Sequence, residues 1–485
     1  MSLINRGIVC PEIDHACELG FGQGLSINMH SAASDVSWYG TDFNPAQASF
    51  AQELGDRSGA KLHIFDDAFE AFLHRQSLPS FDFIGLHGVW SWVSEHNRQV
   101  LVNFLKTKLR PGGVVYISYN SLPGWSPFVP MRHILKQHAS IMGADGEGSQ
   151  KRIDKALGFA EEVLNLNPAY TATYPDVGNK LNDLRGRSRN YPAHEYFNRD
   201  WRPMHFADLA KYMDEAKLSF ACSATIADDM DQILLTEEQT KFVTGISDPI
   251  LRQTVRDFIL NKPFRRDYWV KGLRRMDSAQ QLEQLRSLRV TLQKPANEIQ
   301  KQFNHAGKTV SLSAAVYDPV IDAIMEEHDV LSVGEIELQL KNVGISISQI
   351  REVVVMLSQK GDLKFVARSP QRPDVKTRTA ALNEALLEKA ARTDASPSWL
   401  VSSLLGGGVK VTRIELMFLI ATQHGHSEAS DLAGYAWARL KSKGEKIVID
   451  RLPLETDQQN LERLTSEAEW FLGARRKFFR KLHAL

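Results

Sequence analysis

The sequence has few cysteines and no excess of one charge. Its 485 residues include three cysteines, Cys10, Cys17 and Cys222, which are too scattered for a zinc pattern and are typical of a reducing compartment. Lys and Arg number 58, as do Asp and Glu, so the formal net charge is zero. Proteins whose principal partner is nucleic acid usually carry a basic excess, and we therefore expect no nucleic-acid partner.

Long apolar runs are also missing. No stretch reaches the ~20 residues of a membrane-spanning helix. The N-terminus lacks the basic and then apolar pattern of a secretory signal peptide. We therefore expect a cytoplasmic protein without membrane insertion.

A metal-binding pattern is missing as well. His194, Glu195 and His205 lie near one another in the sequence, but their spacing is not the His-Glu-x-x-His of zinc enzymes. No cysteine accompanies them. We expect no metal site.

A glycine-rich segment near the N-terminus is the most informative pattern that is present. Glu18 ends a short apolar run, and Gly20, Gly22 and Gly24 follow at alternate positions. Glycines let the backbone turn tightly and approach a ligand, and a following helix would aim its free N–H groups at the same place. The spacing differs from the GxGxxG of dinucleotide folds, because Leu25 occupies the third glycine position. A tight strand-to-helix turn without a ligand is the alternative interpretation.

Short apolar segments alternate with helical segments after this loop. We expect further strands within 37–45, 62–67, 81–88 and 109–119, with helices at 45–54 and 97–109. Strands that alternate with helices predict a parallel, doubly wound α/β sheet. Ligands bind such sheets at the carboxyl ends of the strands, where Asp42, Asp66 and Asp67 stand in this sequence.

This ordered set, over residues 14–135, resembles the class I S-adenosylmethionine-dependent methyltransferases, which have a Rossmann-like sheet. The resemblance rests on the Glu18–Gly24 loop, on Asp42, on Asp67-Ala68 and on the Leu-Arg-Pro-Gly-Gly turn at 109–113. Residues 86–93, 116–125, 190–197 and 203–206 are further similar to bacterial methyltransferases that carry a methyltransferase regulatory domain. That group includes rickettsial protein lysine methyltransferases, and the similarity covers most of the chain.

The resemblance implies S-adenosylmethionine as the cofactor. Asp42 would bind the ribose hydroxyls, Asp67 the adenine amino group with Asp66 as the alternative, and the glycine loop with Glu18 the amino-acid end. The full expected set of cofactor-binding residues is Glu18, Gly20, Phe21, Gly22, Gly24, Asp42, Phe43, Asp67, Ala68 and His87. About fourteen residues precede the first strand, whereas the family has an additional N-terminal segment that helps cover the cofactor. What closes the site in this chain, and whether the start is complete, therefore stay open.

The methyl acceptor is expected where the fourth and fifth strands end. The expected catalytic residues are His87, Tyr119 and Asn120, and the expected substrate-binding residues are Trp90, Trp92 and Trp125. Aromatic faces hold an ammonium group by cation–π attraction, and a histidine can accept a proton. A pocket of low dielectric would help a lysine lose its charge. Packing in the core is the alternative role for each aromatic residue.

We expect three domains: a methyltransferase domain at 1–140, a mostly helical regulatory domain at 141–295, and a winged-helix-like α+β region at 296–485. Helix, helix and strand at 333–340, 348–360 and 363–368 suggest the last of these. The predicted function is methyl transfer to a protein lysine. The oligomeric state is left undecided, with a homodimer as one option. The alternatives are a cofactor-binding scaffold with little catalysis, and transfer to a small molecule or a glycan.

Overall fold

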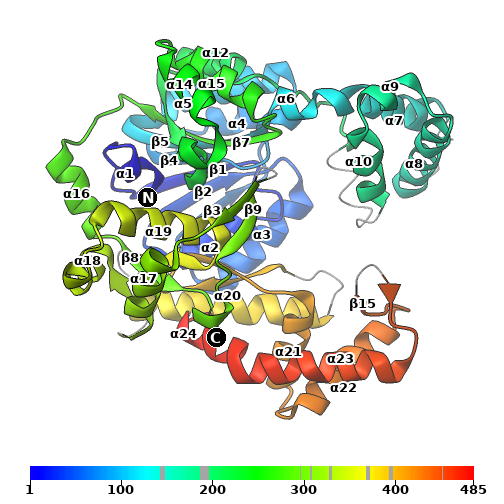
Figure 1. The fold of residues 1–485 in the computed structure, drawn as a ribbon. Helices are drawn as coiled ribbons and strands as arrows, with labels where there is room; N and C mark the ends of the chain where they lie inside the picture. Colours follow the sequence, from blue (N-terminus) through cyan, green and yellow to red (C-terminus); the bar gives the residue numbers. More distant parts are fainter. Residues whose placement is uncertain are drawn as a thin grey trace. The chain divides into compact units, whose positions relative to one another are not determined.

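The computed structural model describes residues 1–142, 148–185, 196–294, 296–305, 308–326, 330–367, 372–392, 397–449 and 452–485. The chain forms two compact units, one of residues 1–84 and 274–485 and one of residues 85–273 (Figure 1). This division cuts across the predicted domain limits at 140 and 295, because both ends of the chain pack into the first unit. The predicted segment at 190–195 lies outside the described residues, as do His194 and Glu195.

The main sheet has seven strands in the order β3-β2-β1-β4-β5-β7-β6. Their bounds are His15–Leu19 (β1), Ser37–Thr41 (β2), Leu62–Phe65 (β3), Phe81–Leu86 (β4), Leu109–Asn120 (β5), Leu218–Ser223 (β6) and Phe264–Lys271 (β7). Strand β2 pairs in parallel with β1 and β3, whereas β7 is antiparallel to β5 and β6. The sheet confirms the predicted α/β class with Rossmann-like strand order.

In the first unit, the C-terminal half of the chain packs on the helices that follow β1 and β2. Helices α2 (Leu25–Ala32), α3 (Pro45–Ser58) and α20 (Pro373–Arg392) contact one another. Their shared core includes Met29, Leu54, Leu382, Leu386 and Val401. The C-terminal segment is therefore part of the hydrophobic core that supports the glycine loop.

The remaining elements of the first unit are short helices and small sheets. They are α1 (Ser2–Asn5), α4 (Phe69–Leu73), α16 (Ser278–Arg286), β8 (Arg289–Leu292), β9 (Gln302–His305), β10 (Lys308–Ser311), α17 (Ala314–Glu326), β11 (Leu331–Ser332), α18 (Val333–Gln339), α19 (Ile347–Lys360), β12 (Leu363–Phe365), β13 (Trp399–Ser402), β14 (Gly407–Lys410), α21 (Arg413–Gln423), α22 (Ala429–Lys441), β15 (Val448–Ile449), β16 (Leu452–Pro453), α23 (Asp457–Trp470) and α24 (Arg476–Lys481). Helices α18 and α19 and strand β12 reproduce the predicted helix–helix–strand order, while the winged-helix identity stays a prediction.

The second unit supplies two strands from a region that the sequence predicted to be mostly helical. Strand β7 pairs with β5 along its length, with Tyr119 opposite Arg265. Residues 218–271 contribute β6 and β7 to the main sheet, and helices are still the majority of the described elements between 141 and 295, as predicted. The charged residues Arg265 and Asp267 obscured β7 in the sequence, because their side chains pair with each other and are buried inside the protein.

A group of helices lies between β5 and β6 in the chain. Its members, coloured cyan to teal in Figure 1, are α6 (Leu122–Trp125), α7 (Val129–Ile141), α8 (Ser149–Asn165), α9 (Ala169–Thr173) and α10 (Asp176–Arg185). Trp125 and Phe128 lie in the core that these helices share. The unit also contains α5 (Glu95–Lys108), α12 (Phe206–Glu215), α13 (Asp231–Leu234), α14 (Glu237–Gly245) and α15 (Pro249–Ile259). In the described parts of both units, no helix has the length and apolar composition to cross a membrane.

Candidate functional site

The glycine loop follows β1 and adopts a conformation that favours glycine at three positions. Gly20, Gly22 and Gly24 have φ angles of +68°, +60° and +69°, a region that residues with a Cβ rarely occupy. A Cβ on Gly24 would lie 2.4 Å from the Cβ of Ala51, whereas one on Gly22 would meet no atom within 4 Å. The neighbouring Phe21 is buried, and its carbonyl accepts a 3.0 Å hydrogen bond from the Gly24 N–H. The lack of a side chain at Gly24 thus allows close packing against Ala51, whereas Gly22 borders open space.

Asp42 fixes this loop from the end of β2. Its Oδ2 accepts a 2.9 Å hydrogen bond from the Gly22 N–H, and its Oδ1 accepts a 3.1 Å bond from the Asn44 N–H. The side chain is buried. A carboxylate oxygen can accept more than one hydrogen bond, so each oxygen keeps acceptor capacity for a ligand hydroxyl. The structure therefore joins two predicted cofactor-binding groups by a direct bond.

Glu18 lies at the base of the loop and is almost fully enclosed. The Ser26 hydroxyl donates a short hydrogen bond to its Oε1. Burial raises the pKa of the Glu18 carboxyl to about 7, and the Ser26 hydrogen bond opposes this rise. A cation placed beside Glu18 would favour its ionised form. The carboxyl is therefore suited to orient an ammonium group.

The residues after β2 and β3 have contrasting environments. The Phe43 side chain is 76% exposed and follows Asp42 directly. Both carboxylate oxygens of Asp67 accept hydrogen bonds from the Arg75 guanidinium, whereas Asp66 is exposed. Ala68 is exposed and caps α4 without a side-chain bond. An exposed aromatic ring such as that of Phe43 can cover a flat ligand, whereas the charge of Asp67 is already compensated by Arg75. The assignments of Asp67 and, as the alternative, Asp66 to the adenine amino group stay predictions.

His87 follows β4 in the second unit and is solvent-exposed at part of its ring. The ring lies edge-on to Tyr116, with 5.9 Å between the centroids. Partial desolvation lowers the pKa of His87, and the positive charge of Arg266 lowers it further. A histidine with a lowered pKa is neutral at pH 7 and can accept a proton.

Tyr119 is fully buried in an ionic network that the sequence analysis did not identify. Its hydroxyl donates to Asp267 Oδ2 at 3.0 Å, and Asp267 also binds Arg265. Arg265 in turn donates to Asp257 at 2.6 Å. Burial raises the pKa of Tyr119 well above its usual value, as does the charge of Asp267. This environment does not support the predicted catalytic role and indicates a role in joining β5 to β7.

Asn120 ends β5 and differs from Tyr119 in its side-chain hydrogen bonding. The side chain is buried, yet its Nδ2 has no hydrogen-bond partner among the described residues. Its backbone is fixed, because the N–H donates to Ser91 Oγ at 2.8 Å and the carbonyl accepts from Met204 N–H at 3.1 Å. An amide N–H group that is not used within the protein can donate to an acceptor atom of a ligand. The geometry supports Asn120 as a binding residue.

The three predicted substrate-binding tryptophans do not share one environment. Trp90 is fully buried, and its indole N–H points to the Met204 sulfur at 3.2 Å. Trp125 packs in the helical core, with the Lys180 ammonium 3.3 Å from its ring centre. Burial leaves these two indoles little surface for a substrate, so the structure favours core roles for them. Trp92 is half-buried and stays a prediction.

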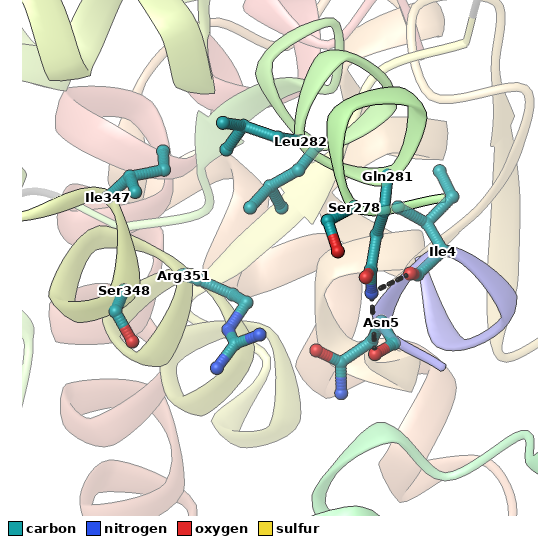
Figure 2. A pocket seen from close by; sticks show the side chains of 9 residues that line it. Ile4, Asn5, Ser278, Gln281, Leu282, Ile347, Ser348 and Arg351 are labelled. Atoms are coloured by element: carbon teal, nitrogen blue, oxygen red, sulfur yellow. Dashed lines mark hydrogen bonds between the residues drawn. The ribbon is translucent and has the colours of Figure 1, made fainter. Parts of the chain in front are cut away.

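Another pocket lies away from every predicted site residue. It has a volume of about 240 Å³ and is lined by α1, α16 and α19, with Arg351 and Gln281 among its side chains (Figure 2). Gln281 Nε2 donates to the carbonyls of Ile4 and Asn5 at 2.8 and 3.1 Å. These bonds anchor the N-terminal helix, and we assign the pocket no function. Across the described residues, no group of three or more His, Cys, Asp or Glu is placed to hold a metal ion.

Comparison with known proteins gives matches to one group. Residues 188–271 match the family described as "Predicted methyltransferase regulatory domain". The protein sll1526 of Synechocystis, which is uncharacterised, is 36% identical over 468 residues, covering 96% of this chain and 90% of its own length. The uncharacterised protein RP028 of Rickettsia prowazekii is 30% identical over 196 residues, covering 39% of this chain and 76% of its own.

A solved structure has the same fold over the whole chain. PKMT2 from Rickettsia typhi, crystallised in complex with AdoHcy, is 16% identical, with a TM-score of 0.68 and coverage of 100% of this chain and 97% of its own. The strand order, the glycine loop with its Asp42 contact and the regulatory-domain match agree with this likeness. The chain belongs to the family of class I S-adenosylmethionine-dependent methyltransferases that carry a methyltransferase regulatory domain.

Proposed function

We propose that the protein transfers a methyl group from S-adenosylmethionine to the side-chain amine of a protein lysine. The observation that carries the proposal is the bond between Asp42 and the Gly22 N–H, beside open space at Gly22. The resemblance to rickettsial protein lysine methyltransferases supports lysine as the acceptor. The likeness to PKMT2 supports it further.

The first unit holds the cofactor in this proposal. Asp42 accepts the two ribose hydroxyls, and Phe43 covers the adenine with its exposed ring. The chain leaves room at Gly22 for the amino-acid portion, and Glu18 faces its ammonium group. The pKa of about 7 for Glu18 then falls, because a neighbouring positive charge favours the carboxylate.

The second unit supplies the groups for the acceptor. S-Adenosylmethionine, when bound, supplies a methyl carbon activated by its positive sulfur. The neutral lysine nitrogen forms the new N–C bond as the C–S bond breaks, and the bonding electrons stay on sulfur. We assign the proton released from lysine to His87, which is neutral at pH 7 because its pKa is lowered. Asn120 offers a buried amide to fix the acceptor.

The test is to incubate the purified chain with a bacterial lysate and S-adenosylmethionine labelled in the methyl group. Label in methylated lysine after acid hydrolysis of the protein fraction is the expected result. The Asp42→Ala variant is the matched control and should incorporate little label. Label confined to small molecules, lipids or glycans would overturn lysine as the acceptor and leave the methyltransferase assignment in place. The absence of label everywhere would favour a scaffold role.

A further inference from the structure

A basic pocket in the second unit has no counterpart among the predicted sites. It has a volume of about 660 Å³ and is bordered by helix α7 and residues 201–203. Its side chains include Arg132, His133, Lys136 and Arg202, together with the indole of Trp201. No Asp or Glu is among the described residues that line it. The pocket thus presents cations and one aromatic wall.

Arg132 is the central feature of this pocket, because it is buried without a counter-ion among the described residues. The residue is 6% exposed, and its guanidinium stacks on Trp201 at 4.3 Å from the ring centre. Its Nη2 donates to the Asn198 carbonyl at 2.8 Å. Its Nε and the Trp201 Nε1 are buried and lack partners within the described part of the chain. Two donors are therefore left for a bound acceptor.

The other buried arginines of this unit are paired differently. Arg98, Arg256 and Arg265 each bind a carboxylate, at 3.1, 2.8 and 2.6 Å respectively. Among the described residues, Arg132 has a carbonyl oxygen and the Trp201 ring as partners and no carboxylate. A buried charge without an opposite charge is costly in free energy. Burial lowers the pKa of Arg132 to about 10, so the group is still a cation at pH 7.

The cationic side chains near Arg132 have other hydrogen-bond partners. Arg202 pairs with Glu95 at 2.8 Å, and Lys136 donates to the Arg199 carbonyl at 2.9 Å. Arginine binds carboxylate and phosphate through a planar set of N–H groups, which makes Arg132 the suited anchor. Lys136 would add positive charge beside it.

The pocket borders the end of β5, where the acceptor residues lie. Leu122 lines the pocket and follows Asn120 by two positions. On the other side, Pro203 lines it and precedes Met204, whose N–H donates to the Asn120 carbonyl. The pocket is therefore in the same unit as Asn120, and residues that line it are neighbours of Asn120 and of its partner Met204 in the sequence.

We propose that this pocket binds an oxyanion through Arg132, and that the oxyanion is a carboxylate or phosphate group of the acceptor protein. The binding site stands on the geometry of Arg132 and Trp201 alone. Its assignment to the acceptor rests on the proposed function. An acidic or phosphorylated side chain near the methylated lysine would then select the substrate.

Thermal unfolding tests the binding site without any methyl transfer. The full-length protein, Arg132→Met and the control Arg199→Met are heated in sodium phosphate, in sodium succinate and in sodium chloride of equal ionic strength. Arg199 is the control because it lies two positions before Trp201 in the chain and its side chain is 91% exposed. In chloride, Arg132→Met should raise the Tm, because it removes an unpaired buried charge. Phosphate or succinate should raise the Tm of the wild type and of Arg199→Met by a few degrees more than that of Arg132→Met. Equal shifts in all three proteins would overturn the site.

Peptide methylation tests the assignment to the acceptor. Lysine peptides carrying Glu, phosphoserine or Gln at each flanking position are compared by kcat/KM. At one position, Glu or phosphoserine should exceed Gln by at least about tenfold, equivalent to ~1.4 kcal/mol. Arg132→Met should lose this preference, and Arg199→Met should keep it. Equal preferences in all proteins would overturn the acceptor assignment. If no peptide or protein is methylated, the proposed function fails with it, while the Tm shifts still decide the anion site.

Discussion

Replacing Asp42 with alanine should weaken cofactor binding strongly while the fold survives. The Asp42 carboxylate accepts bonds from Gly22 N–H and Asn44 N–H and keeps capacity for two ribose hydroxyls. Hydrogen bonds to a charged group contribute about 1.5–3 kcal/mol. The Kd for S-adenosylmethionine should therefore rise by roughly 10- to 150-fold. Leaving the Gly22 N–H without its acceptor adds a stability cost of about 1–3 kcal/mol.

Isothermal titration calorimetry with S-adenosylhomocysteine gives the affinity, and urea unfolding gives the stability separately. Asp56→Ala is the control, because Asp56 lies on α3 in the same unit, is exposed and accepts a hydrogen bond from the Gln52 side chain. The control should bind like the wild type. An Asp42→Ala protein that is folded and binds with unchanged affinity would refute the assignment of Asp42 and the argument that links the loop to the ribose.

Three further predictions follow from the same geometry. Gly22→Val should abolish cofactor binding in calorimetry, because a branched side chain would fill the open space and resist the positive φ; normal binding would make the loop only a structural turn. NAD should show no saturable competition with S-adenosylmethionine, because Leu25 replaces the third glycine, and micromolar competition would contradict this. In the wild type, kcat/KM should fall as the pH drops below ~6.5, because the lowered pKa of His87 keeps its imidazole neutral above that pH. His87→Gln should remove this acidic limb of the kcat/KM–pH profile. An unchanged limb would exclude His87 as the base.

Tyr119→Phe concerns the buried network and tests the reassignment of that residue. The free energy of unfolding should fall by about 1.5–3 kcal/mol, because the Asp267 carboxylate loses a buried donor. Turnover per folded molecule should change little. A large loss of turnover with unchanged urea stability would restore the catalytic role predicted from the sequence.

Local patterns in the sequence were sufficient for the sheet and for the cofactor loop. The alternation of strands and helices predicted the α/β class, and the spacing of Gly20, Gly22 and Gly24 predicted a loop that the structure confirms as left-handed at all three positions. Such features depend on the conformational limits of residues near one another in the chain. The position of Asp42 beside the loop was also predictable, because the carboxyl ends of parallel strands meet at one edge of the sheet; its role toward the cofactor stays a prediction.

Tertiary contacts decided the rest, because burial depends on residues far apart in sequence. In the sequence, Tyr119, Trp90 and Trp125 are equally consistent with a binding surface and with a core. Only contacts with distant residues placed them inside: Tyr119 bonds to Asp267 of β7, Trp90 contacts Met204, and Trp125 packs in the core of the helices between β5 and β6. The same holds for β7, because its charged residues Arg265 and Asp267 gave no sign of a strand that lies between β5 and β6. Arg132 shows the limit most directly, because arginine is a common surface residue and only the fold buries this side chain on Trp201, with no carboxylate partner in the described part of the chain. The sequence by itself thus determined the cofactor loop and the class of sheet, whereas the fold alone decided which polar and aromatic side chains remain free to meet a ligand.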